Sequence, residues 1–229
     1  MRQGVFYGVG IGPGDPELLT LKAVRVLEKC PVIAAPQTKG ENMLALEIAG
    51  KAVDLSEKTV LPLRFTMSRN QEEQTAAHRA AADLLLPHLR EGRDVAMLNL
   101  GDVSIYSTYC YLMELIKVYG FETVMIPGVP SFCAVAARLG ISLTGMNTPL
   151  HILPAGGCSL EEELSLTGTK VLMKSGKRLR QVEAILEKSG KVEKAAAVMN
   201  CGLPEEKICR KLSELPEDPG YFLTMIVKE

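Results

Sequence analysis

The chain has 229 residues, and its 26 basic and 27 acidic side chains give a formal net charge of -1. This length allows one large or two modest domains, and the balanced charge argues against a nucleic-acid partner held by bulk electrostatic attraction. No apolar run approaches the roughly 20 residues that cross a bilayer, and the N-terminus shows no signal sequence. We therefore expect a cytoplasmic protein with neither a nucleic-acid nor a membrane partner.

The first half of the chain alternates short β-rich runs with helix-like stretches, which is the pattern of parallel βαβ units. We expect strands at residues 5–10, 31–36, 59–63, 94–100 and 122–126, and helices at residues 16–30, 71–90, 107–118 and 131–139. Asp15 stands immediately before the first of these helices. Its carboxylate is therefore expected to cap that helix.

The composition changes at residues 141–149, where Ser, Thr, Gly, Asn and Pro gather as they do in linkers. Beyond this stretch we expect strands at residues 151–154, 170–174, 195–200 and 221–227, and helices at residues 160–166, 179–188 and 204–215. The sequence therefore predicts two α/β domains, residues 1–146 and 147–229.

The cysteines and histidines show no arrangement typical of a metal site. The six cysteines include no C-x-x-C pair, and the three histidines lack paired metal-ligand spacing. Most of the cysteines lie in apolar stretches, as expected of small buried side chains in a reducing compartment. Because structural zinc needs clustered thiolate and imidazole ligands, we predict no bound metal.

Glycine- or proline-containing turns follow three of the expected strands. Residues 8–15 read GVGIGPGD, but the dinucleotide pattern G-x-G-x-x-G fails in both registers, because Pro13 and Asp15 stand where glycine is required. Turns at residues 101–102 and 127–128 end two further strands. The carboxyl ends of parallel strands share one edge, and ligands of open α/β sheets bind there. We therefore expect the three turns to build one site.

Three segments resemble the signatures of the tetrapyrrole (corrin/porphyrin) methylases. They are residues 8–23, 101–106 and 126–131, which occur in order and at suitable spacing, with Val103 where the common family pattern has proline. The resemblance extends over the whole chain and implies an N-terminal parallel sheet and a C-terminal mixed sheet, with the active site in the cleft between the two domains. It also implies a homodimer that uses S-adenosylmethionine as methyl donor and forms S-adenosylhomocysteine.

Within the family, residues 101–112 (GDVSIYSTYCYL) are most similar to methyltransferases that act on carbon 20 of precorrin-2 or cobalt-factor II. The implied activity is methyl transfer to that carbon in cobalamin (vitamin B12) biosynthesis. Methylation of a different tetrapyrrole carbon, as by another precorrin methylase or a uroporphyrinogen-III methyltransferase, is an open alternative. A non-catalytic tetrapyrrole carrier is another. The resemblance leaves open whether the ring contains cobalt.

Carried over residue by residue, the resemblance implies cofactor contacts in both domains. These are Pro13, Gly101, Asp102, Ile105, Tyr106, Ser131, Phe132, Met173, Lys174, Cys201 and Gly202. Asp102 fits this role on chemical grounds too, because an acid beside a glycine at a strand end is suited to accept hydrogen bonds.

The implied substrate has several carboxylates, which arginine and lysine side chains bind well. The candidates are Arg64 and Arg69, followed by Lys39, Arg79 and Lys177. Tyr109 is a further substrate candidate, and a place in the core is its alternative. Methyl transfer from a sulfonium needs alignment rather than a nucleophilic side chain, and the sequence identifies no catalytic base.

Overall fold

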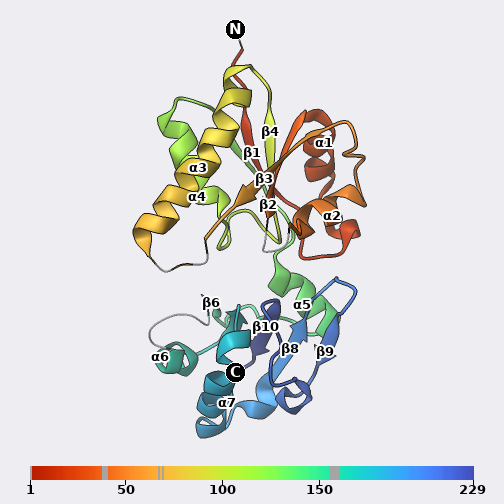
Figure 1. Cartoon of the computed structure of the whole chain (residues 1–229). Helices are drawn as coiled ribbons and strands as arrows, with labels where there is room; N and C mark the ends of the chain where they lie inside the picture. Colours follow the sequence, from red (N-terminus) through yellow and green to blue (C-terminus); the bar gives the residue numbers. More distant parts are fainter. Residues whose placement is uncertain (1, 38–40, 67, 69, 155–159) are drawn as a thin grey trace. The chain divides into compact units, whose positions relative to one another are not determined.

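The computed structural model describes residues 2–37, 41–66, 68, 70–154 and 160–229. By their internal contacts the residues form two compact units, Met1–Pro130 and Ser131–Glu229. Each unit has one five-stranded sheet with helices packed against it (Figure 1). The prediction of two α/β units, each built on its own sheet, is therefore confirmed. Lys39, Arg69 and Cys158 lie outside the described residues.

The sheet of the first unit has five parallel strands in the order β3-β2-β4-β1-β5. They are β1 (Phe6–Gly10), β2 (Val32–Gln37), β3 (Thr59–Arg64), β4 (Val95–Asn99) and β5 (Thr123–Ile126), close to the predicted bounds. Because all five strands are parallel, their carboxyl ends lie at one edge. The three turns singled out in the sequence follow β1, β4 and β5, which are neighbours in the sheet.

Helices cover both faces of this sheet (Figure 1). On one face lie α1 (Leu21–Lys29) and α2 (Leu44–Gly50), and on the other α3 (Gln71–Arg90) and α4 (Tyr109–Val118) pack together. Apolar side chains of α3 and α4 meet alternate strand residues such as Val95 and Met97, because successive side chains of a strand point to opposite faces. α3 has the bounds predicted from its sequence, whereas α2 was not predicted.

The first helical segment differs from the prediction. Asp15 caps a separate short 3-10 helix, Pro16–Leu18, by accepting a hydrogen bond from the Glu17 N–H at 2.9 Å. α1 begins later, where the Thr20 hydroxyl accepts from the Ala23 N–H at 3.1 Å. The prediction that Asp15 caps the long helix is wrong, because extended backbone at Leu19 and Thr20 separates the two helices.

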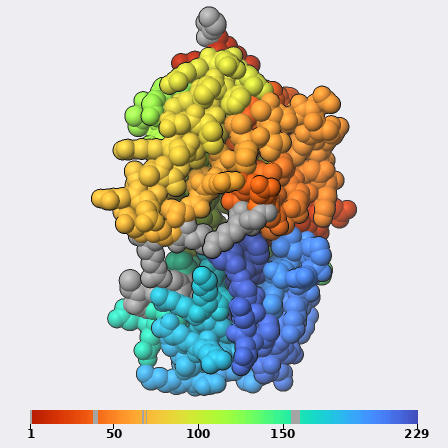
Figure 2. All heavy atoms as spheres, viewed as in Figure 1, coloured from red at the N-terminus to blue at the C-terminus, as the bar shows by residue number. Residues whose placement is uncertain are grey.

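The second unit has a mixed sheet in the order β6-β7-β10-β8-β9. Its strands are β6 (Leu150–Pro154), β7 (Thr169–Met173), β8 (Ala195–Met199), β9 (Lys207–Cys209) and β10 (Leu223–Val227). β10 runs antiparallel to both of its neighbours, β7 and β8. On the face drawn in Figure 2, the last residues of the chain, in dark blue, accordingly run between cyan and mid-blue segments.

Helices also lie against this second sheet. α5 (Ser131–Leu139) packs on β8 and β10. α6 (Leu160–Ser165) and α7 (Leu179–Lys188) contribute buried leucines to a core that includes Leu223, Met225 and Val227 of β10. Because α5 packs on the second sheet, the division between the units falls after Pro130, earlier than the expected boundary after residue 146.

The prediction of a helix at residues 204–215 is wrong. The structure has strand β9 and a short 3-10 helix, Leu212–Glu214, in this stretch. Glutamate, lysine and leucine favour a helix locally, but Ile208 pairs with Val198 and Cys209 with Ala197 along β8. Tertiary strand pairing therefore overrides the local preference.

Candidate functional site

The turns after β1 and β4 are joined directly at the carboxyl edge of the first sheet. Gly12 and Gly101 form an isolated β-bridge, in which the Gly101 N–H donates to the Gly12 carbonyl at 2.8 Å and the Gly12 N–H donates to the Gly101 carbonyl at 3.3 Å. Both have positive φ, 75° and 73°, which glycine adopts without the steric cost of a Cβ. The two loops therefore share a backbone bridge that depends on glycine.

Close packing brings the turn after β5 to the same place. A Cβ on Gly128 would lie 2.4 Å from the Gly101 carbonyl oxygen, and a Cβ on Gly10 would lie 2.6 Å from the Gly128 nitrogen. Any larger residue at either position would push the loops apart. The three turns thus contact one another as expected, and glycines at residues 10, 101 and 128 make these contacts possible.

Asp102 links two of these loops through its side chain. Its Oδ2 accepts a hydrogen bond from the Gly128 N–H at 2.9 Å, and its Oδ1 accepts from the N–H and hydroxyl of Ser104 at 2.8 and 2.5 Å. Burial raises the pKa of Asp102, but the hydrogen bonds from Ser104 and Gly128 outweigh it, so the pKa lies below its ordinary value. The carboxylate is therefore ionised at neutral pH, and it has acceptor capacity left for a ligand.

A buried amide fixes both ends of the loop between β4 and α4. Asn99 Nδ2 donates to the Met97 carbonyl at 3.0 Å, and Asn99 Oδ1 accepts from the Ser107 hydroxyl at 2.6 Å. Ser107 Oγ in turn accepts the Tyr109 N–H at 3.1 Å. Within the loop Tyr106 has a positive φ of 50°, and such strain in a non-glycine residue is concentrated at functional sites. Sequence reasoning missed Asn99 and Ser107.

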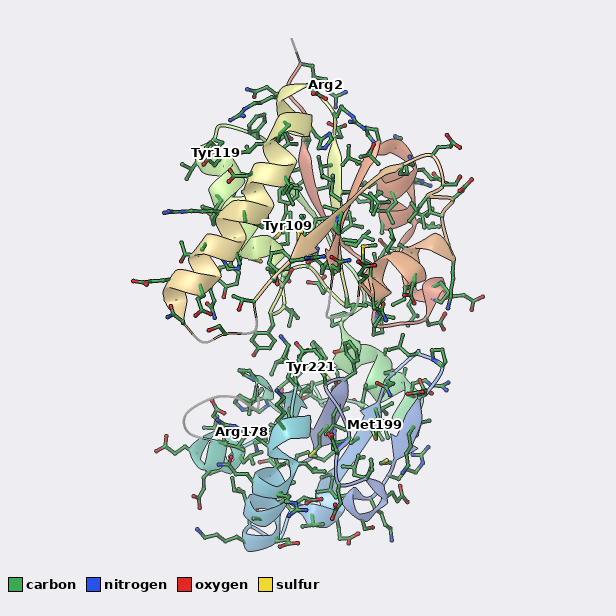
Figure 3. The ribbon with its side chains drawn as sticks, in the orientation of Figure 1. Arg2, Tyr109, Tyr119, Arg178, Met199 and Tyr221 are labelled. Atoms are coloured by element: carbon green, nitrogen blue, oxygen red, sulfur yellow. The ribbon has the colours of Figure 1, made fainter. Side chains whose placement is uncertain are left out.

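Tyr109 lies in the core of the first unit (Figure 3). It is 0% exposed, and its hydroxyl lies 3.0 Å from the Phe6 carbonyl and 3.1 Å from the Val124 carbonyl. A Cβ on Gly8 would lie 2.6 Å from its ring, so glycine there makes room for the tyrosine. Burial raises the pKa of Tyr109. The structure therefore supports the core alternative, and Tyr109 is not retained as a substrate candidate.

The remaining cofactor candidates of the first unit lie in the same two loops. Pro13 and Ile105 are half-buried, and Tyr106 is exposed. Together with Gly101 and Asp102 they share the carboxyl edge of β1 and β4. The structure thus brings all five first-unit candidates to one edge.

The other cofactor candidates lie in the second unit, at two places. Ser131 and Phe132 begin α5. Met173 ends β7 and Lys174 follows it, while Cys201 and Gly202 lie in the turn after β8. These strand ends share one edge of the second sheet, because both strands run antiparallel to β10. Lys174 and Asn200 at this edge have positive φ, 57° and 50°. Two strained non-glycine residues, at the ends of the two strands that flank β10, mark this edge as a second candidate surface.

Glu206 supports the loop after β8. Its Oε2 accepts the Gly202 N–H at 2.7 Å, and its Oε1 accepts from Arg138 Nε of α5, also at 2.7 Å. Burial raises the pKa of Glu206, but the hydrogen bonds from Arg138 and Gly202 outweigh it and keep the pKa below its ordinary value. An ionised carboxylate therefore connects α5 with the turn that contains Gly202.

Among the described substrate candidates, Arg64 lies at the carboxyl edge of the first sheet. It ends β3, and its Nε donates to Gln37 Oε1, at the end of the neighbouring β2, at 2.8 Å. Arg79 is exposed along α3, and Lys177 is exposed in the short 3-10 helix Gly176–Arg178 of the second unit. Arg64 and Arg79 thus lie on different elements of the first unit, and Lys177 belongs to the second unit.

Burial makes four of the described thiols less acidic, because it raises the pKa of Cys30, Cys110, Cys133 and Cys209. These four residues are free thiols, and burial raises the pKa of Cys30 to about 12. Groups of three or more metal-ligating side chains are absent from the described part of the chain. In that same part, no helix is both long and apolar enough to span a membrane.

Comparison with known proteins agrees with this architecture. A family model described as Tetrapyrrole (Corrin/Porphyrin) Methylases matches residues 5–216. The chain is 32% identical to a cobalt-precorrin-2 C(20)-methyltransferase of Salmonella typhimurium, over 99% of this chain and 97% of that protein. It is 36% identical to a probable cobalt-precorrin-2 C(20)-methyltransferase of Methanocaldococcus jannaschii, over 97% of this chain and 95% of that protein.

A solved structure shows the same fold. It is that of uroporphyrin-III C-methyl transferase from Thermus thermophilus complexed with S-adenyl homocysteine, with a TM-score of 0.69 and 25% identity over 99% of this chain and 98% of that one. The two sheets, the glycine turns and these matches agree. The chain belongs to the tetrapyrrole (corrin/porphyrin) methylase family.

Proposed function

We propose that this protein transfers a methyl group from S-adenosylmethionine to carbon 20 of precorrin-2 or its cobalt-containing form in cobalamin biosynthesis. The observation that carries the proposal is similarity over nearly the whole chain, at 32% and 36% identity, to two proteins named for that reaction. Both names specify the cobalt-containing substrate, which favours that form here.

The residues of the first unit suit the cofactor. Glycines at residues 10, 12, 101 and 128 let the backbone approach a ligand closely. The ionised Asp102 carboxylate can accept a hydrogen bond from a ribose hydroxyl or from an ammonium group. When bound, the cofactor supplies a methyl group made electrophilic by its sulfonium. The chain's own part is to hold the cofactor and substrate in line and to exclude water.

The residues of the second unit are proposed as further cofactor contacts on the strength of the family resemblance. They are Ser131, Phe132, Met173, Lys174, Cys201 and Gly202. Strained backbone at Lys174, beside Met173, and at Asn200, beside Cys201, supports this assignment. We further propose that Arg64 binds a substrate carboxylate, and that the protein acts as a homodimer in the cytoplasm.

The position of the new methyl group tests the proposal. The protein is incubated with S-adenosylmethionine labelled with carbon-13 in the methyl group, and with metal-free precorrin-2 or cobalt-factor II in parallel. Nuclear magnetic resonance of the product then locates the label. We expect it on carbon 20, with faster turnover of the cobalt-containing ring.

A different tetrapyrrole carbon is the second candidate. It is favoured by the similarity to uroporphyrin-III C-methyl transferase at 25% identity. The same experiment includes uroporphyrinogen III as a third substrate. Label on carbon 2 or 7 would support this candidate and overturn the assignment to carbon 20, and absence of label from all three rings would overturn the methyltransferase proposal.

A further inference from the structure

Two adjacent aromatic side chains are exposed in the second unit. Tyr221 is 47% exposed and Phe222 is 41% exposed, and their rings meet edge to face with centroids 5.2 Å apart. An exposed aromatic pair offers ring surface to a flat or apolar partner. Neither residue was singled out in the sequence.

Sheet topology places this pair at the edge already described. Tyr221 and Phe222 immediately precede β10, whose first residues pair with the last residues of its neighbours: Leu223 with Met199 of β8, and Thr224 with Met173 of β7. Figure 3 labels Tyr221 at this end of the second sheet. The aromatic pair therefore lies beside the strand ends that precede Lys174 and Asn200.

The backbone on both sides of the pair is fixed. The Asn200 N–H donates to the Phe222 carbonyl at 3.0 Å. A Cβ on Gly176 would lie 1.9 Å from the Gly220 carbonyl oxygen, so these two segments touch through their backbones. The Gly220 N–H donates to Asp218 Oδ1 at 3.2 Å. The backbone that carries the two rings therefore needs little ordering when the surface binds a ligand.

Positive charge surrounds the aromatic rings on the β7 side. Lys174 Nζ lies 5.9 Å from the centroid of the Tyr221 ring, and Lys177 is exposed three residues further on. Residues 173–180 include no acidic side chain. Nearby, Glu217 pairs with Arg180, and Asp218 accepts the Gly220 N–H. On the β7 side the aromatic pair thus has a cationic border.

We propose that Tyr221 and Phe222 form a docking platform for the tetrapyrrole ring, with Lys174 and Lys177 attracting its carboxylates. This inference rests on the proposed function. A conjugated macrocycle offers a flat face for aromatic contact, and its carboxylates complement the lysines.

Binding measurements on the full chain test the platform. The variants Tyr221→Leu, Phe222→Leu and the double leucine variant keep apolar side chains but lose the ring faces. Tyr119→Leu is the matched control, because Tyr119 is an exposed aromatic residue at the C-terminus of α4 in the first unit. Cobalt-factor II is titrated by its absorption spectrum, and S-adenosylhomocysteine is titrated by calorimetry.

We expect the double variant to bind cobalt-factor II about tenfold more weakly, as for loss of a central aromatic contact, and to bind S-adenosylhomocysteine as wild type does. The control should match wild type for both ligands. Unchanged cobalt-factor II affinity in the double variant would overturn the platform alone. Weaker binding of S-adenosylhomocysteine alone would also overturn it and assign the pair to the cofactor. If wild-type protein bound no cobalt-factor II, the proposed function would fail, and the platform with it.

Discussion

The carboxylate of Asp102 accepts a hydrogen bond from the backbone N–H of Gly128, 26 residues further along the chain, at 2.9 Å. This bond ties the loop after β4 to the turn after β5. Gly10 packs against Gly128, so the loop after β1 belongs to the same assembly. The proposed cofactor surface is therefore three loops joined by one carboxylate and by glycine contacts.

Replacing Asp102 should weaken cofactor binding strongly. Asp102→Ala removes an ionised acceptor and leaves the Gly128 N–H without its partner, so we expect roughly 10- to 100-fold lower affinity for S-adenosylhomocysteine. Isothermal titration calorimetry measures this loss. Asp83→Asn, at an exposed position of α3, is the control and should bind as wild type does. Equal affinity in the Asp102 variant would remove Asp102 from the site.

A methyl group at Gly128 should disrupt the loop assembly. In Gly128→Ala the new Cβ would lie 2.4 Å from the Gly101 carbonyl oxygen, and we expect a loss of about 1–3 kcal/mol in the free energy of unfolding. Urea denaturation provides the measurement. Gly50→Ala is the contrast, because nothing lies within 4 Å of its Cβ at the end of α2. It should be neutral or stabilise by up to about 1 kcal/mol.

Tyr109→Phe distinguishes a core residue from a substrate contact. The ring still fills the space beside Gly8, but the buried hydroxyl no longer donates to the Phe6 or Val124 carbonyl. We expect the free energy of unfolding to fall by about 1 kcal/mol, with kcat and KM for the tetrapyrrole unchanged. A raised KM without loss of stability would return Tyr109 to the substrate site.

Glu206→Gln tests the support of the Gly202 turn. The carboxylate is ionised because its pKa lies below the ordinary value, and the substitution weakens its charged hydrogen bond with Arg138. We expect affinity for S-adenosylhomocysteine to fall severalfold, as measured by calorimetry. The exposed neighbour Glu205 gives the matched control, Glu205→Gln, which should have no effect. If both variants bind like wild type, the charge of Glu206 does not support the cofactor site.

Local sequence predicts most elements of the first unit. β-rich runs ending in glycine turns indicate β1 and β4, and the alanine-rich stretch predicts α3 with its observed bounds. α2 escapes prediction because it is only seven residues long and its N-cap, Met43, makes no side-chain capping bond. Short uncapped helices depend on tertiary packing rather than on a local signal.

The site is predictable only in part, because some of its contacts also depend on tertiary packing rather than on local sequence. Glycines at strand ends and a neighbouring acid are local features of the sequence, and they indicate Asp102. Asn99 and Ser107 escape prediction because their hydrogen bond depends on how the intervening loop folds back. Tyr221 and Phe222 escape it because their position follows from insertion of the last strand between β7 and β8, an order that a sequence pattern does not reveal.

A crystal structure of this protein with S-adenosylhomocysteine tests the central claim most directly. We predict that the ligand lies at the carboxyl edge of β1 and β4, in contact with Pro13 and within hydrogen-bonding distance of the Asp102 carboxylate or of the backbone that follows it. A ligand bound away from both residues, or a saturated crystal without ligand at this edge, would contradict the account.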